Sequence, residues 1–206
     1  MAIYDQITRI SNAKADIKAA IEAKGVSVGE GTLDTYAEKI GEIQVGNDDL
    51  IIKLVDGSLT EFDIPEGTTR IKAYLFCTNG SIKIVNIPDT VKSIGLYAFN
   101  GCGRLTSITI PDSVELIDNF AFRLCPELNE ITIGNGVTNI GTQSLDIGSS
   151  SKKATIIMKP TTPPVIQSNT IGANVEKIIV PVGTGDTYKA ASIWSNYASI
   201  IEEATA

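Results

Sequence analysis

The sequence predicts an α/β repeat solenoid with short parallel strands, preceded by an N-terminal helical hairpin. Two observations carry this prediction: an apolar pattern that returns every 23 residues, and a polar break at residues 46–49 that separates this pattern from two helix-like segments. The equivalent apolar positions form four series: Leu59, Ile82, Leu105 and Leu128; Ile64, Ile87, Ile110 and Ile133; Ile71, Ile94, Ile117 and Ile140; and Phe76, Phe99, Phe122 and Leu145.

The period of 23 falls within the range of about 20–29 residues that is typical of leucine-rich repeats, and the run LxxIxIP fits their strand signature. The clearest unit is LTSITIPDSVELIDNFAFRLCP at residues 105–126. Proline ends each strand because it has no N–H to donate to a ladder. We expect the Leu and Ile series inside a core that is stabilised by contacts between neighbouring repeats.

The first 46 residues predict a helical hairpin. In the first helix the apolar residues recur at helical spacing, as Ile7, Ile10, Ile17 and Ile21. A second series, Leu33, Tyr36, Ala37, Ile40 and Ile43, predicts the second helix. Two short helices bury little surface alone, so this hairpin needs a partner. We expect two domains, with residues 1–46 for docking or oligomerisation and residues 47–206 for the repeats; the alternative is that the hairpin plugs the first repeat.

Both ends of the repeat domain predict caps, which a repeat stack requires. A strand at 50–55 and a type I′ turn at Asp56 and Gly57 would form the N-terminal cap. After Leu145 the period slips through an insertion at 148–153 and an extended connector at 160–164. Residues 175–181 restore the strand form once. The segment 186–204 predicts a short helix whose aromatic residues, with Trp194 among them, close the far end of the core.

Composition excludes several classes of partner. The formal net charge is −7 and no run of Lys or Arg occurs, whereas nucleic-acid binding needs clustered positive charge. No apolar run approaches the roughly 20 residues that a membrane-spanning helix needs, so no membrane insertion is expected. The amphipathic start lacks the apolar stretch of a secretory signal. We therefore expect a chain made without its own export signal.

The residue types also argue against catalysis and cofactors. The chain has no histidine, which removes Ser-His-Asp catalysis and imidazole metal sites. The carboxylates Asp112, Glu115 and Asp118 follow a strand, where solvated turn residues are the default, although a carboxylate-dependent glycosidase is kept as a third hypothesis. The three cysteines do not have the CxxC spacing of a zinc site. Cys102 and Cys125 lie one repeat apart and are predicted to be either two buried thiols or a disulfide.

The candidate binding site is the polar face of the strands. In LxxIxI the residue between the two isoleucines points outward, because strand side chains alternate between faces. These residues and their polar neighbours form the predicted site: Asp63, Lys83, Asn86, Thr106, Thr109, Asn129, Glu130 and Thr132. We place them on the concave face, which solenoids use for binding. No aromatic platform for sugar stacking is visible, so a glycan is not favoured over a protein ligand.

The repeats LTSITIPDSVELIDNFAFRLCPE and IKIVNIPDTVKSIGLYAFNGC resemble the BspA-type leucine-rich repeat of bacterial surface proteins, and VEKIIVPVGTGDTYKAASIWSNYASIIEEA is similar to the C-terminal cap of such proteins from Bacteroidales-like gut bacteria. This resemblance covers residues 59–204 and implies adhesion to host proteins or cells, without catalytic residues to carry over. Separately, ISNAKADIKAAIEAKGVSVGEGTLDTYAEKI is similar to a helical module of phage tail and fibre-type proteins.

Two functional hypotheses follow. The first is a non-enzymatic structural or attachment protein of a phage virion that displays the repeats outward, with virion docking or self-association through residues 1–46. The alternative is a bacterial BspA-like adhesin at the cell surface or outside the cell. Both give the repeat domain a protein or cell-surface ligand, and neither requires a cofactor.

Overall fold

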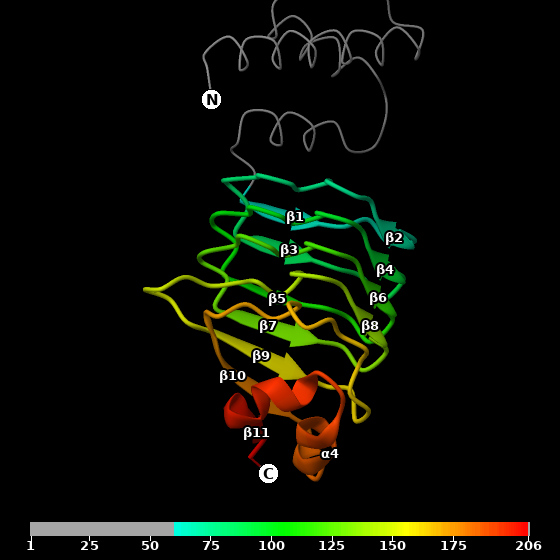
Figure 1. The fold of residues 1–206 in the computed structure, drawn as a ribbon. Coiled ribbons are helices and arrows are strands. Elements are labelled where there is room, and N and C mark those ends of the chain that lie inside the picture. Colours follow the sequence, from blue (N-terminus) through cyan, green and yellow to red (C-terminus); the bar gives the residue numbers. More distant parts are fainter. Residues whose placement is uncertain (1–59, 206) are drawn as a thin grey trace, which may run out of the picture. The chain divides into compact units, whose positions relative to one another are not determined.

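The structure is a computed structural model that describes residues 60–205, and these belong to a compact unit spanning Leu59–Ala206. The predicted helical hairpin at 1–46 and the predicted turn at Asp56 and Gly57 lie outside the described residues and stay predictions. The described chain coils through successive turns, each of which adds one strand to a main sheet (Figure 1).

The main sheet contains the strands that the LxxIxIP pattern predicts and two further strands, at 154–158 and 201–203, that it does not predict. These strands are β1 (Glu61–Asp63), β3 (Ile84–Asn86), β5 (Ser107–Thr109), β7 (Glu130–Ile133), β9 (Ala154–Met158), β10 (Val175–Val180) and β11 (Ile201–Glu203). Every pairing in this sheet is parallel, and Phe62 aligns with Val85 as Ile108 aligns with Ile131, one period of 23 residues apart. The prediction of a solenoid with short parallel strands is therefore confirmed.

A second sheet runs along another side of the solenoid (Figure 1). Its two-residue strands are β2 (Arg70–Ile71), β4 (Ser93–Ile94), β6 (Leu116–Ile117) and β8 (Asn139–Ile140), paired in parallel in that order. The isoleucine of each strand is buried, as the periodic Ile series predicts. Two residues are too few to show the alternation of buried and exposed side chains that identifies a strand. The sequence therefore predicted that these isoleucines are buried, but not that they belong to a second sheet.

The remaining side of each repeat is a series of turns that hydrogen-bond to the next repeat. The Phe99 N–H donates to the Ala121 carbonyl at 2.8 Å, and the Phe122 N–H donates to the Ser144 carbonyl at 3.1 Å. Inside these turns, Phe76, Phe99 and Phe122 form a column in which ring centroids lie 5.0 Å apart. Stacked aromatic pairs of this kind stabilise the core beyond their burial.

Between the predicted insertion at 148–153 and the predicted connector at 160–164 lies a strand that the sequence analysis did not predict. This strand is β9, whose residues alternate between buried and half-buried and whose Ile156 pairs with Ile131 of β7. The spacing from Ile131 is 25 residues rather than 23, because the chain makes an additional turn that projects from the solenoid (Figure 1, yellow). The Ser149 N–H closes that turn by donating to the Lys152 carbonyl at 2.7 Å.

The C-terminal segment covers the far end of the core, as the aromatic pattern predicts. Helix α4 (Gly185–Ala190) and the 3-10 helix η1 (Trp194–Ile200) bring Tyr188 and Trp194 together edge to face at 5.0 Å. Both rings are buried, and each donates a 2.7 Å hydrogen bond to the connector: the Tyr188 hydroxyl to the Pro160 carbonyl and the Trp194 Nε1–H to the Pro164 carbonyl. Burial raises the pKa of Tyr188.

The cysteines are thiols. Cys102 and Cys125 are fully buried, and their S–H groups lie 3.2 Å from the Phe76 carbonyl and 3.1 Å from the Phe99 carbonyl. Of the two interpretations that the sequence allows, the structure supports buried thiols that act as small apolar residues of the core.

Candidate binding surface

The outer face of the main sheet carries all eight predicted site residues. Asp63 aligns with Asn86, and Thr109 aligns with Thr132, so these four residues occupy one column at successive repeats. The remaining four lie beside that column and are exposed: Lys83, Thr106, Asn129 and Glu130. The structure thus brings the predicted residues together on one face, and their role in binding stays a prediction.

One hydrogen bond joins two residues of this face. The Asn86 side-chain N–H donates to the Asp63 carboxylate at 2.6 Å, across neighbouring repeats. A second column, which the sequence analysis omitted, runs beside the first and begins with Glu61, Ile84 and Ser107. The same alternation of strand side chains would have identified it, because these residues also flank a buried strand position.

The main sheet is open between β3 and β5. Within residues 60–205 no backbone hydrogen bond joins these two strands, whereas β1 pairs with β3 and β5 pairs with β7. The Ile64 N–H donates to the Asn86 carbonyl at 3.0 Å and the Ile110 N–H donates to the Thr132 carbonyl at 2.8 Å, but the equivalent bond from Ile87 to Thr109 is missing.

The opening is confined to the main sheet. In the same two repeats β4 pairs with β6, and the Phe99 N–H reaches the Ala121 carbonyl at 2.8 Å. The two repeats are therefore joined along the second sheet and the turns, while their main-sheet strands lie side by side without ladder hydrogen bonds. A geometry of this kind leaves main-chain donors and acceptors of β3 and β5 without their ladder partners.

A cleft of about 470 Å³ lies at this opening. Its polar lining residues are Asn86, Asp89, Ser107, Thr109, Asp112 and Lys159. Ile84 also lines the cleft and is 47% exposed, which is high for an isoleucine in a sheet. The cleft contains two of the predicted site residues, Asn86 and Thr109, and it lies at the ends of the strands from which they come.

The rim of this cleft is acidic. Glu66, Asp89 and Asp112 occupy equivalent positions one repeat apart, each directly after the proline that ends a strand. A second hollow of about 400 Å³ adjoins the cleft and is lined by Asp63 and Glu66. Lys159 is the cation in the cleft lining, and its ammonium lies 3.7 Å from the Asp112 carboxylate.

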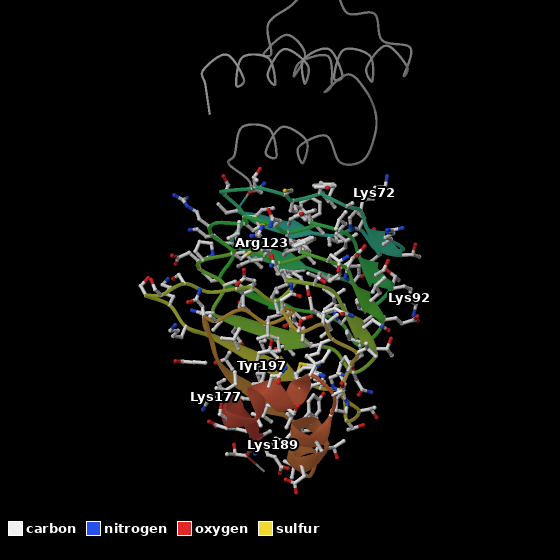
Figure 2. The ribbon with its side chains drawn as sticks, viewed as in Figure 1. Lys72, Lys92, Arg123, Lys177, Lys189 and Tyr197 are labelled. Carbon is white, nitrogen blue, oxygen red and sulfur yellow. The ribbon has the colours of Figure 1, made fainter. Side chains whose placement is uncertain are left out.

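Apart from Lys83 and Lys159 on the main-sheet side, cations also lie on other sides of the described surface. Figure 2 shows Lys72 and Lys92 along the side that carries the second sheet, away from the acidic rim. Arg123 lies on the turn side, where its guanidinium is 5.8 Å from the centre of the Phe120 ring. The acidic rim thus has Lys159 as the cation beside it, and further cations lie on the other sides of the solenoid.

A column of aromatic residues that the sequence analysis did not identify is present on the turn side. The rings of Tyr74, Tyr97 and Phe120 stack with centroids 5.2 Å and 4.7 Å apart, and Tyr74 is 55% exposed. The recurrence of aromatic residues at 74, 97 and 120 was a signal in the sequence that the analysis did not use. Because the rings stack on one another, the column presents ring edges rather than the faces that sugars need.

Two classes of site are not found in the described part of the chain. Residues 60–205 contain no group of three His, Cys, Asp or Glu side chains placed to hold a metal ion. Nor does this part of the chain contain a helix of the length and apolarity that crossing a membrane requires.

Solved structures that are similar to this chain, at low sequence identity, include the following proteins. A leucine-rich repeat protein from Bacteroides ovatus is 23% identical over 70% of this chain and 42% of its own, with a TM-score of 0.46. The pneumococcal vaccine antigen PcpA is 20% identical over 70% of this chain and 40% of its own, with a TM-score of 0.46. A leucine-rich cell surface protein from Faecalibacterium prausnitzii is 19% identical over 75% of this chain and 62% of its own, with a TM-score of 0.27.

The chain thus spans less than two thirds of the length of each of these structures. No match was found among curated proteins. The family model described as the BspA type leucine-rich repeat region (6 copies) matches residues 55–171, which is more than half of the chain. This chain belongs to the BspA-type leucine-rich repeat family.

Proposed function

We propose that this chain is a non-enzymatic adhesin of the bacterial cell surface or extracellular space, which binds a protein or cell-surface ligand through the outer face of the main sheet. The observation that carries the proposal is the polar column from Asp63 to Thr132, whose side chains are exposed or half-exposed and which adjoins the cleft between β3 and β5. A solenoid presents such a surface to ligands because neighbouring repeats place equivalent residues in a row.

Two of the three carboxylates that could support a glycosidase, Asp112 and Asp118, accept main-chain hydrogen bonds, which favours a binding function. The Asp112 carboxylate accepts a 2.9 Å hydrogen bond from the Asn135 N–H, and the Asp118 carboxylate accepts one at 2.7 Å from the Asn119 N–H. Asp118 therefore stabilises its own turn, and Asp112 joins two neighbouring repeats. The absence of histidine from the sequence removes the commonest general base.

Membership in the BspA-type family supports the adhesin hypothesis over the virion hypothesis. The virion hypothesis depends on the segment 1–46, which lies outside the described residues. Docking or self-association through that segment remains a prediction that is compatible with either setting.

The proposal is tested by placing lysines on one face or the other. Asn86→Lys, Thr109→Lys and Thr132→Lys together alter the main-sheet column, whereas Ser93→Lys, Leu116→Lys and Asn139→Lys together alter an equivalent column of the second sheet. Beads coated with the full chain are applied to cultured animal cells and, separately, to bacterial cells. We expect the main-sheet variant to lose adherence at least about tenfold, because a buried contact with a mismatched charge is costly.

The second-sheet variant should adhere like the unaltered chain, and circular dichroism should show that both variants are folded. Equal adherence of the two folded variants would place the binding surface away from the main sheet. If beads coated with the unaltered chain adhere to neither cell type, an adhesive function towards these cells is contradicted.

A further inference from the structure

The opening between β3 and β5 exposes main-chain groups in a pattern that another peptide can match. In the intact parts of the sheet, the Lys83 N–H donates to the Thr60 carbonyl at 2.8 Å and the Asn129 N–H donates to the Thr106 carbonyl at 3.0 Å. The equivalent bond from Thr106 to Lys83 is missing, as is the bond from Ile87 to Thr109. Each strand thus offers alternating donors and acceptors towards the cleft, and a peptide main chain supplies the same alternation.

The solenoid is joined at this point in a way that allows the cleft to widen. Neighbouring strands in a sheet lie about 4.8 Å apart, so a strand between β3 and β5 needs these to stand roughly twice that distance from one another. The pairing of β4 with β6 and the turn bonds keep the same repeats together on the other sides. A bound segment would have to separate β3 from β5 while those contacts hold the repeats together, and no ladder hydrogen bond between β3 and β5 opposes that separation.

The charges around the cleft favour a basic peptide. Asp89 and Asp112 line the cleft, Asp63 and Glu66 line the adjoining hollow, and Lys159 is the opposing cation, paired with Asp112 at 3.7 Å. An extended segment with Lys or Arg at alternate positions would place its cations on one face, because strand side chains alternate. The acidic rim complements such a segment and repels an acidic one.

We propose that the cleft binds an extended basic segment of a protein partner, which completes the main sheet by pairing with β3 on one edge and β5 on the other. This inference rests on the proposed binding function of the main-sheet face and specifies its partner. The exposed side chain of Ile84 gives the bound segment an apolar contact within the cleft.

Synthetic hexapeptides test the charge requirement. The probe is an acetylated and amidated peptide of three Thr-Lys dipeptides, titrated calorimetrically into the full chain, and its control contains three Thr-Glu dipeptides. We expect heat of binding from the basic peptide and none from the acidic one. Asp89→Asn with Asp112→Asn should weaken the basic peptide roughly 2- to 30-fold, the range that two exposed ion pairs provide, whereas Asp186→Asn on α4 should leave its affinity unchanged.

Backbone methylation tests the pairing of both edges. Methylating the N–H groups of the three lysines removes the donors along one edge of the peptide, and methylating those of the three threonines removes the donors along the other edge, without changing charge. Each change should weaken binding at least about tenfold, because three hydrogen bonds are lost. If only one of the two methylated peptides binds more weakly, the peptide pairs with a single strand. If neither binds more weakly, the peptide is held by electrostatic attraction alone. Either result overturns the proposal.

A cross-link locates the site. Ile84→Cys with Ser107→Cys, in a Cys77→Ser background, ties β3 to β5 and should abolish peptide binding until the disulfide is reduced. The matched pair Ser107→Cys with Glu130→Cys ties strands that are already paired, so it should leave binding intact. If the peptides fail to bind while bead adherence still depends on the main-sheet column, this inference is wrong and the proposed function stands. If the peptides bind but bead adherence does not depend on that column, the proposed function is wrong and the cleft still binds basic peptides.

Discussion

At the scale of single residues, equivalent positions in four successive repeats adopt a left-handed backbone without being glycine. The four residues and their φ angles are Tyr74 (+63°), Tyr97 (+55°), Phe120 (+59°) and Gln143 (+50°). This conformation costs a residue with a Cβ roughly 1–2 kcal/mol. In Tyr97 and Phe120, stacking at 4.7 Å offsets part of that cost. Gln143 ends the column and has no ring to stack.

Gln143→Gly should therefore stabilise the protein. Removing about 1–2 kcal/mol of backbone strain, less the 0.5–1 kcal/mol entropy cost of glycine, predicts a gain of about 0.5–1 kcal/mol in the free energy of unfolding. Tyr97→Gly is the control: it relieves the same strain but loses two stacked contacts, so no gain is expected. Urea denaturation monitored by circular dichroism measures both. A destabilised Gln143→Gly variant would show that this side chain contributes more than its backbone conformation costs.

At the scale of elements, Glu203 connects the last strand of the main sheet to the segment that begins α4. Its carboxylate accepts hydrogen bonds from the Gly183 N–H at 3.0 Å and the Gly185 N–H at 2.8 Å. These bonds, first that from Gly183 and then that from Gly185, lower the pKa of Glu203, with a smaller contribution from the charge of Lys189. The ionised form of Glu203 therefore attaches the C-terminal cap to β11.

This attachment predicts a pH dependence at the acidic end. Because the pKa of Glu203 is lower in the folded chain than in the unfolded one, its stabilising contribution is present above the unfolded pKa and is lost as pH falls through the folded pKa. Glu203→Gln should thus be less stable than the unaltered chain at pH 7. The difference should shrink as pH falls below about 4.5, since that is the ordinary value for the group. Urea midpoints at pH 7 and pH 3 test this, and a difference that does not depend on pH would contradict it.

Elements with a regular period could be predicted from the sequence, and those without one could not. The Ile series placed β1, β3, β5 and β7, because each strand contributes a buried position that returns every 23 residues. Strand β9 escaped because its Ile156 lies 25 residues after Ile131, so the count slips although the pairing continues. A fixed spacing of apolar residues thus identifies the repeats, but it misses a strand that follows a longer loop.

For the candidate site, the alternation of strand side chains correctly identified which residues face outward. The opening between β3 and β5 could not be predicted, because the repeats on either side of it have the same length and the same strand signature. LTSITIP in one repeat and IKIVNIP in the other predict equivalent strands. Pairing between strands depends on how the repeats pack in three dimensions, and no local propensity encodes it.

At the scale of the whole described unit, stability depends on contacts between neighbouring repeats. The main sheet is divided into one block of β1 and β3 and another that runs from β5 to β11, while the second sheet continues without a break from β2 to β8. The molecule thus keeps its core continuous and opens one side of it. That combination provides the acidic cleft without separating the solenoid into two units.

Amide hydrogen exchange of the free protein, followed by NMR, tests this opening most directly. It compares equivalent residues one repeat apart: Ile87 with Ile110, and Thr106 with Asn129. Ile110 and Asn129 donate their amides across the intact ladder at 2.8 Å and 3.0 Å, whereas Ile87 and Thr106 face the opening. We expect the amides of Ile87 and Thr106 to exchange at least about tenfold faster than their partners, because no ladder hydrogen bond protects them. Equal protection in both pairs would mean that β3 and β5 are joined and that the cleft is closed.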